Sequence, residues 1–94
     1  MIEWTERAAG QLEQARDYIA LSNSASVADR IVRRILLSVE HLAAFPTAGR
    51  PGRVAGTREL VIPNTPFLAA YAVDRDRVVI LAVYHGAQRW PEAF

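Results

Sequence analysis

The residues best suited to bind an anion or to transfer a proton lie in two segments of this chain. Near its C-terminal end, His85 is followed by Arg89 and Trp90. Earlier, the segment from His41 to Arg58 contains no acidic residue and three basic ones, Arg50, Arg53 and Arg58. Guanidinium groups bind phosphates and carboxylates, and an imidazole exchanges protons near neutral pH. The two segments therefore predict a surface that binds a partner, with acid–base catalysis as the alternative.

The arginines also have structural interpretations. All eleven basic residues are arginine, yet the net charge is only +1, so the positive charge is local. Arg50 and Arg53 would cap the C-terminus of a preceding helix, where cations are favoured. Arg58 would form an exposed pair with Glu59, which contributes little to stability. The cluster as a whole still favours an anionic partner.

A nuclease needs more groups than these segments supply. Cleavage of RNA through its 2′-hydroxyl takes a base, an acid and cations at the phosphate. His85, Arg89 and Arg58 are the candidates, but a single histidine at a strand end is more commonly a hydrogen-bonded structural residue. Trp90 either closes the edge of the core or anchors a partner. His41 and His85 are far apart and cysteine is absent, so we expect no metal and no other cofactor.

Two amphipathic helices must position these residues. Thr5 is expected to cap a helix over residues 6–21, in which apolar side chains recur at helical spacing. A second helix is expected over 26–44, where Ser26 and Asp29 resemble a weak capping box. A few polar residues separate the two helices, which predicts a helical hairpin.

The remaining segments predict strands. Residues 2–4 form a short strand, and apolar runs at 59–62, 67–73 and 78–84 are joined by tight turns. The last run has no polar alternation, which predicts a strand at the centre of the sheet. Residues 45–56 are rich in Gly and Pro and should form a loop. The order predicts an α+β fold, β-α-α-β-β-β, in which the helical hairpin packs on one face of a three-stranded antiparallel meander.

Length and composition predict one domain over residues 1–94. A chain of 94 residues with 51% apolar composition can bury one modest core. The absence of cysteine fits a reducing compartment. Because the sequence begins at Met1 without a signal peptide and has no apolar stretch near 18 residues, we expect a cytoplasmic protein with no membrane span.

An ordered set of motifs resembles the RelE/ParE superfamily of bacterial type II toxins over nearly the whole chain. The motifs are Trp4-Thr5 before the first helix, the loop at 45–53, the segment at 56–61 and the ending at 80–91. The resemblance implies a cognate antitoxin that wraps around the toxin in a hetero-oligomer, with a ParD-like protein of the ribbon–helix–helix type as the expected partner.

The superfamily has two mechanisms. RelE-like members cleave messenger RNA on the ribosome, whereas ParE-like members are reported to poison DNA gyrase. Matched to the RelE pattern, this chain has no lysine, has Phe67 at the strand position that should carry arginine, and has Phe94 at the position of the terminal tyrosine. The arginine of the terminal segment falls on Gln88, with Arg89 next to it.

The missing nuclease groups favour the ParE-like branch. We therefore expect a gyrase-binding toxin without an active site of its own, and a ribosome-dependent endoribonuclease is the alternative. A member that has lost toxicity and only binds its antitoxin is a third possibility. The residues expected to contact the target are Arg50, Arg53, Arg58, His85, Arg89 and Trp90.

Overall fold

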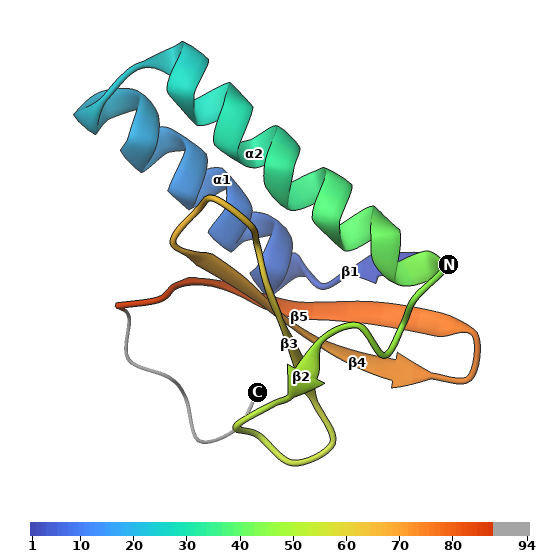
Figure 1. Ribbon diagram of the computed structural model, residues 1–94. Helices are drawn as coiled ribbons and strands as arrows, with labels where there is room; N and C mark the ends of the chain where they lie inside the picture. Colours follow the sequence, from blue (N-terminus) through green and yellow to red (C-terminus); the bar gives the residue numbers. More distant parts are fainter. Residues whose placement is uncertain (88–94) are drawn as a thin grey trace.

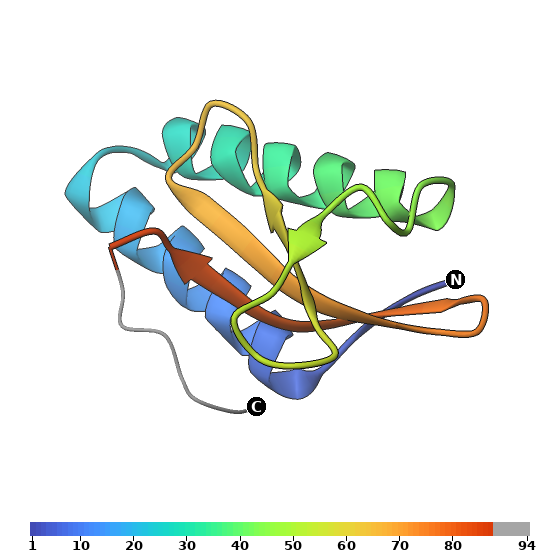
Figure 2. The ribbon, with the colours of Figure 1, turned by 60° about the horizontal axis from the view of Figure 1, so that its bottom comes forward.

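A computed structural model describes residues 1–87 and shows two helices packed on one face of a mixed sheet (Figures 1 and 2). The sheet has five strands in the order β1-β5-β4-β3-β2. The elements in chain order are β1 (Ile2–Trp4), α1 (Glu6–Ser22), α2 (Ala25–Glu40), the 3-10 helix η1 (His41–Ala43), β2 (Arg50–Pro51), β3 (Arg58–Val61), β4 (Phe67–Asp74) and β5 (Arg77–His85).

The predicted α+β fold is confirmed, including the helical hairpin and the antiparallel meander of β3, β4 and β5. The sheet is larger than the meander because β1 pairs in parallel with β5, and the two-residue strand β2 pairs with β3. The interpretation of residues 45–56 as entirely loop was therefore wrong at Arg50–Pro51. Two residues are too few to give a sequence pattern, so only the pairing with β3 defines this strand.

The start of each helix depends on one hydroxyl group. The Oγ1 of Thr5 accepts a hydrogen bond from the N–H of Ala8, as predicted for a cap. The second helix begins earlier than predicted, because the Oγ of Ser24 accepts from the N–H of Val27. Ser26 is therefore not the cap. Asp29 instead binds Arg16 of α1 at 2.7 Å, which connects the two helices at an exposed site.

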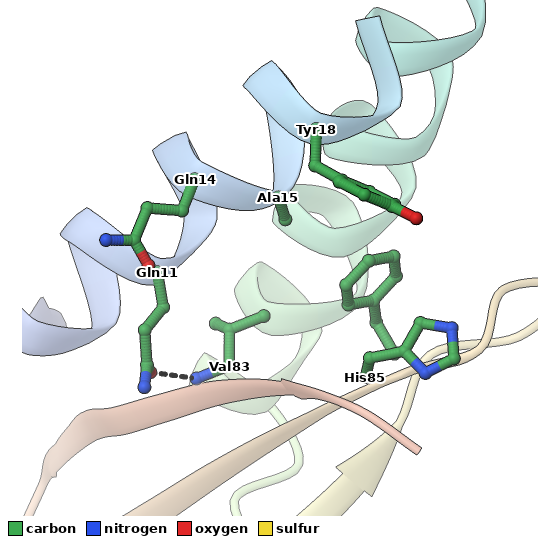
Figure 3. A pocket seen from close by; sticks show the side chains of 7 residues that line it. Gln11, Gln14, Ala15, Tyr18, Val83 and His85 are labelled. Carbon is green, nitrogen blue, oxygen red and sulfur yellow. Dashed lines mark hydrogen bonds between the residues drawn. The ribbon is translucent and has the colours of Figure 1, made fainter. Parts of the chain in front are cut away.

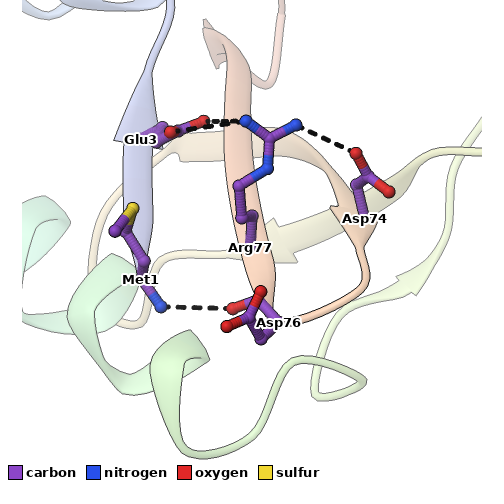
Figure 4. A network of polar contacts seen from close by, with 5 residues as sticks. All are labelled: Met1, Glu3, Asp74, Asp76 and Arg77. Carbon is purple, nitrogen blue, oxygen red and sulfur yellow. Dashed lines mark hydrogen bonds and ion pairs between the residues drawn. The ribbon is translucent and has the colours of Figure 1, made fainter.

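The first strand is held against β5 by backbone pairing and by an exposed network of charges (Figure 4). The guanidinium of Arg77 lies 3.1 Å from Glu3 and 2.9 Å from Asp74, and the N-terminal ammonium donates to the carbonyl of Asp76. The hydrogen bond to Asp74, followed by the negative charge of Glu3, raises the pKa of Arg77. Because this network is exposed, we expect it to stabilise the fold only weakly.

The last apolar run, β5, lies inside the sheet between β1 and β4 as predicted, although the middle strand of the five is β4. On its outer side, β5 pairs with β1 only from Val78 to Ile80. The apolar run of β5 is unbroken because the strand contains a bulge. The pairing shifts between Ala70 and Tyr71 of β4, so Leu81 has no partner there. Beyond such a bulge, the side chains that faced one side of the sheet face the other, which interrupts the alternation of apolar and polar residues.

The main core lies between the helices and the sheet. It contains Ala8 and Ile35 from the helices and Phe67, Tyr71 and Ile80 from the sheet. A smaller cluster lies on the opposite face of the sheet and consists of Ala70, Ala82 and Tyr84. Side chains of β4 are therefore buried on both faces of the sheet. This makes β4 a rigid support for the strands on either side of it.

Candidate functional site

The loop between η1 and β3 is organised by a buried carboxylate. Glu59 is only 3% exposed, and its Oε1 accepts from the Nε and Nη2 of Arg50 at 3.2 and 3.1 Å. Its Oε2 accepts from the backbone N–H of Arg53 at 3.0 Å. A buried carboxylate requires such partners, because desolvation without them is costly. Glu59 therefore fixes both the side chain of Arg50 and the backbone of Arg53.

A buried tyrosine holds the other part of the same loop. Tyr71 of β4 is fully buried, and its hydroxyl accepts from the N–H of Gly49 and donates to the carbonyl of Pro46, both at 2.8 Å. Gly49 is required here by space, since an added Cβ would lie 2.6 Å from this hydroxyl and 2.8 Å from the carbonyl oxygen of Glu59. The loop is thus attached to the sheet at two buried polar groups.

Two structural interpretations of the arginines were wrong. Arg50 binds Glu59 rather than the end of the helix, and Glu59 is buried rather than paired with Arg58 at the surface. Arg58 instead donates to the carbonyl of Gly49 at 2.8 Å. The Arg50 side chain is still 56% exposed, so its guanidinium can meet a partner while it binds Glu59. The loop presents its cations on a fixed backbone.

The second candidate segment borders a cleft between α1 and the end of β5 (Figure 3). The cleft has a volume of about 400 Å³ and is lined by Gln11, Gln14, Ala15, Tyr18, Phe67, Val83 and His85. Gln11 reaches from α1 to accept a hydrogen bond at 2.8 Å from the N–H of Val83, on the edge of β5 just beyond the end of β1. This contact closes the base of the cleft, while the Tyr18 side chain lies at its rim and is 71% exposed.

His85 itself has a well-defined setting at this cleft. Its Nδ1 accepts a hydrogen bond from the N–H of Ala87 at 3.1 Å, and its ring meets the edge of Phe67 with centroids 5.5 Å apart. A nitrogen that accepts a hydrogen bond carries no proton, so the neutral ring holds its proton on Nε2. This geometry fits a hydrogen-bonded structural residue whose ring orientation is fixed by Ala87 and Phe67.

The structure does not bring all the predicted residues together. Arg58 is level with Tyr71 and Ile80, near the middle of β4, whereas His85 pairs with Phe67 at the start of β4. From strand spacing and rise, the Cα atoms of Arg58 and His85 are on the order of 16 Å apart. Arg89 and Trp90 lie outside the described residues. The predicted site is therefore divided into a loop region and a cleft region.

The described part of the chain contains no group of three His, Cys, Asp or Glu side chains that could hold a metal ion. Within the same residues, neither helix combines the length and the apolar character needed to cross a membrane. Cations and rings on rigid supports are suited to binding a partner surface.

Comparison with known proteins identifies the family. The model of the family described as "ParE toxin of type II toxin-antitoxin system, parDE" matches residues 2–90. The chain belongs to this ParE toxin family. Its solved relatives include a chain of the chromosomal ParDE TA system from P. aeruginosa, which is 30% identical and superposes with a TM-score of 0.82 over 89% of this chain and 92% of that one.

Two curated relatives agree with this assignment. The protein named "Putative toxin Y4kP" from Sinorhizobium fredii is 43% identical over 91 residues, which cover 97% of this chain and 93% of that protein. The toxin RelE2 of Caulobacter vibrioides is 34% identical over 87 residues, which cover 93% of this chain and 96% of that protein. This ParE-family chain thus spans nearly the full length of both relatives, and the superfamily suggested by its motifs is confirmed.

Sequence reasoning missed the residues that support the ParE-family site. Glu59 joins β3 to the loop just before it, whereas Tyr71 and Gln11 each join an element to one that is distant in the chain. One signal was available for Glu59, which is an acid within an apolar strand and just follows an acid-free, arginine-containing loop. The pairing of Gln11 with Val83 has no such signal, because a glutamine on a helix is usually exposed.

Proposed function

We propose that this ParE-family chain stops bacterial growth by binding DNA gyrase in the cytoplasm, and that a ParD-like antitoxin neutralises it. Membership in the ParE family and the structural likeness to a ParDE chain support this proposal. The observation that carries it is the setting of the cations, since Arg50 and Arg58 are held by Glu59 and by loop carbonyls. Cations fixed in this way provide a rigid recognition surface rather than groups poised to move protons.

The target contacts would come from both regions of the divided site. Arg50, Arg53 and Arg58 would supply the loop contacts, and His85, with Arg89 and Trp90, would supply those at the end of β5. Because the two regions are on the order of 16 Å apart, one flat protein partner could meet both, whereas a single scissile phosphate could not. This separation is a further argument against a nuclease built on His85, Arg89 and Arg58.

The test is to measure two activities of the same purified chain. We expect inhibition of DNA supercoiling by purified gyrase, with accumulation of cleaved DNA, and no codon-specific cleavage of ribosome-bound messenger RNA. Cleavage of the messenger RNA with gyrase unaffected would contradict the proposal. Inactivity in both assays, with retained binding of the antitoxin, would identify a member that is no longer toxic.

Substitution of His85 separates binding from catalysis. If His85 only contributes to a recognition surface, His85→Ala should weaken the inhibition of gyrase and leave a measurable part of it. If His85 were the acid or base of a nuclease, the same change would abolish toxicity. Gln14→Ala is a suitable control, because Gln14 borders the same cleft from α1.

A further inference from the structure

An acidic stripe runs along α1 on the side of the helical hairpin that the sheet does not cover (Figure 2). Glu6, Gly10, Glu13 and Asp17 follow one another at intervals of three and four residues, so they share one face of the helix. This face is about half a turn away from the buried Ala8. The three acids are exposed, and none of them forms an ion pair with a residue between 1 and 87.

A basic stripe runs along α2 on the same side of the hairpin. Arg30, Arg33 and Leu37 are also three or four residues apart and lie on the side of the helix opposite the buried Ile35. Both arginines are exposed and form no ion pair with a described residue. The Leu37 side chain is 61% exposed. The outer face of the hairpin therefore carries opposite charges on its two helices.

Gly10 leaves a hollow in the middle of the acidic stripe. Glycine destabilises the interior of a helix relative to alanine, so its presence there needs a reason. No described residue supplies one, because a Cβ added at Gly10 would meet no atom within 4 Å and the backbone there has no positive φ. Glycine also occurs where another chain approaches the backbone closely. The hollow thus indicates a contact from outside the chain.

The two stripes match in position along the helices. Arg16 of α1 binds Asp29 of α2 at 2.7 Å, which fixes the level of the two antiparallel helices. Counted from this pair, Glu13 is level with Arg33 to within one turn of helix. One turn further along, the hollow at Gly10 is level with the exposed side chain that ends the basic stripe.

From these observations we propose that two copies of this chain associate through the outer face of α1 and α2. A two-fold axis that runs between the helices and parallel to them lays α1 of each copy on α2 of the other at the same level. Glu13 of each copy then meets Arg33 of the other, and Leu37 enters the hollow at Gly10. Unlike charges face each other at both symmetric positions, which favours a second copy as the occupant.

The dimer is expected to be weak. Two adjacent helices of 17 and 16 residues present a face of about 25 Å by 20 Å, so the pair buries about 1,000 Å² in total. This area is at the lower end for specific interfaces, and we expect a dissociation constant on the order of 10–100 μM. The inference goes beyond the proposed function and does not depend on it. The loop region adjoins β2 and β3 and stays uncovered in such a dimer.

Sedimentation equilibrium of the full chain over about 5–500 μM measures the association. Arg33→Glu should weaken it about tenfold, because an attraction becomes a repulsion at two symmetric contacts. Glu13→Arg should weaken it to a similar degree, and the double variant should restore it to within about threefold of the original. Arg7→Glu is the matched control, since it makes the same change in net charge outside both stripes and should alter the association less than about twofold.

Gly10→Gln separates an interface role from a purely local one. Glutamine favours the helix, so the variant should melt about 3 °C higher at a concentration where the chain is monomeric. Its side chain fills the hollow that Leu37 would enter, so the association should weaken about tenfold. A glycine with only a local role would change the melting temperature and leave the association as it was.

Three results would overturn the proposal. The first is a chain that remains monomeric up to about 500 μM. The second is a dimer that Gly10→Gln does not weaken, and the third is a dimer that the double charge reversal fails to restore. Either of the last two would place the contact on another face of the molecule. None of the three bears on the inhibition of gyrase, which is measured separately.

Discussion

The loop region around Glu59 adjoins β2 and β3, the cleft region around His85 lies between α1 and the end of β5, and the two are built in different ways. In the loop region, the polar groups bind one another inside the protein, as Glu59 and Tyr71 show. In the cleft region, Tyr18 and Gln14 border an open space, and one partly buried hydrogen bond, from Val83 to Gln11, joins β5 to α1. Internal partners give a loop its shape, whereas an open cleft leaves side chains available for a ligand. Substitutions in the first region should therefore change stability more than those in the second.

Glu59→Ala should have the largest effect on stability. Its loss removes a buried carboxylate that accepts from the N–H of Arg53 and from Arg50, so we expect a decrease of about 2 kcal/mol in the free energy of unfolding. Urea denaturation monitored by circular dichroism measures this change. The control is Glu3→Ala, which removes an exposed partner of Arg77 and should cost less than about 1 kcal/mol. Equal effects of the two substitutions would show that the buried Glu59 stabilises the fold no more than an exposed carboxylate does.

Tyr71→Phe should have the next largest effect. It removes one hydroxyl and leaves both the N–H of Gly49 and the carbonyl of Pro46 unpaired in a buried place, at an expected cost of about 1–2 kcal/mol. For a domain of this size, that corresponds to a decrease of about 5–10 °C in melting temperature. Tyr18→Phe makes the same chemical change at an exposed side chain and should leave the melting temperature within about 2 °C. A large effect at Tyr18 would remove the contrast between the two regions.

Gln11→Ala should have the smallest effect of the three. The N–H of Val83 loses its acceptor, but it lies at the border of a cleft that water can enter, so we expect a cost of about 0.5–1 kcal/mol. Gln14→Ala is the matched control from the same helix and should be neutral within about 0.5 kcal/mol. Amide exchange at Val83 gives a local measurement, since it should accelerate in Gln11→Ala alone. Unchanged exchange would show that Gln11 does not support the cleft.

Local patterns in the sequence determined the elements of this protein and its family. The helical hairpin and the meander follow from apolar periodicity and from turn residues, which act over a few positions of the chain. The ordered motifs suggested the toxin superfamily, which the family match over residues 2–90 confirms. Capping at Thr5 was also predictable, because the hydroxyl and its partner are three residues apart.

Only the tertiary structure decided which residues act together. The bulge at Leu81, the parallel pairing of β1 and the burial of Glu59 all depend on partners that are distant in the chain. The sequence around a charged residue does not tell whether that residue is buried. Its burial depends on which residues the strand register places next to it. For the same reason, the sequence grouped Arg58 with His85, whereas the sheet places them on different strands, four positions apart along β4.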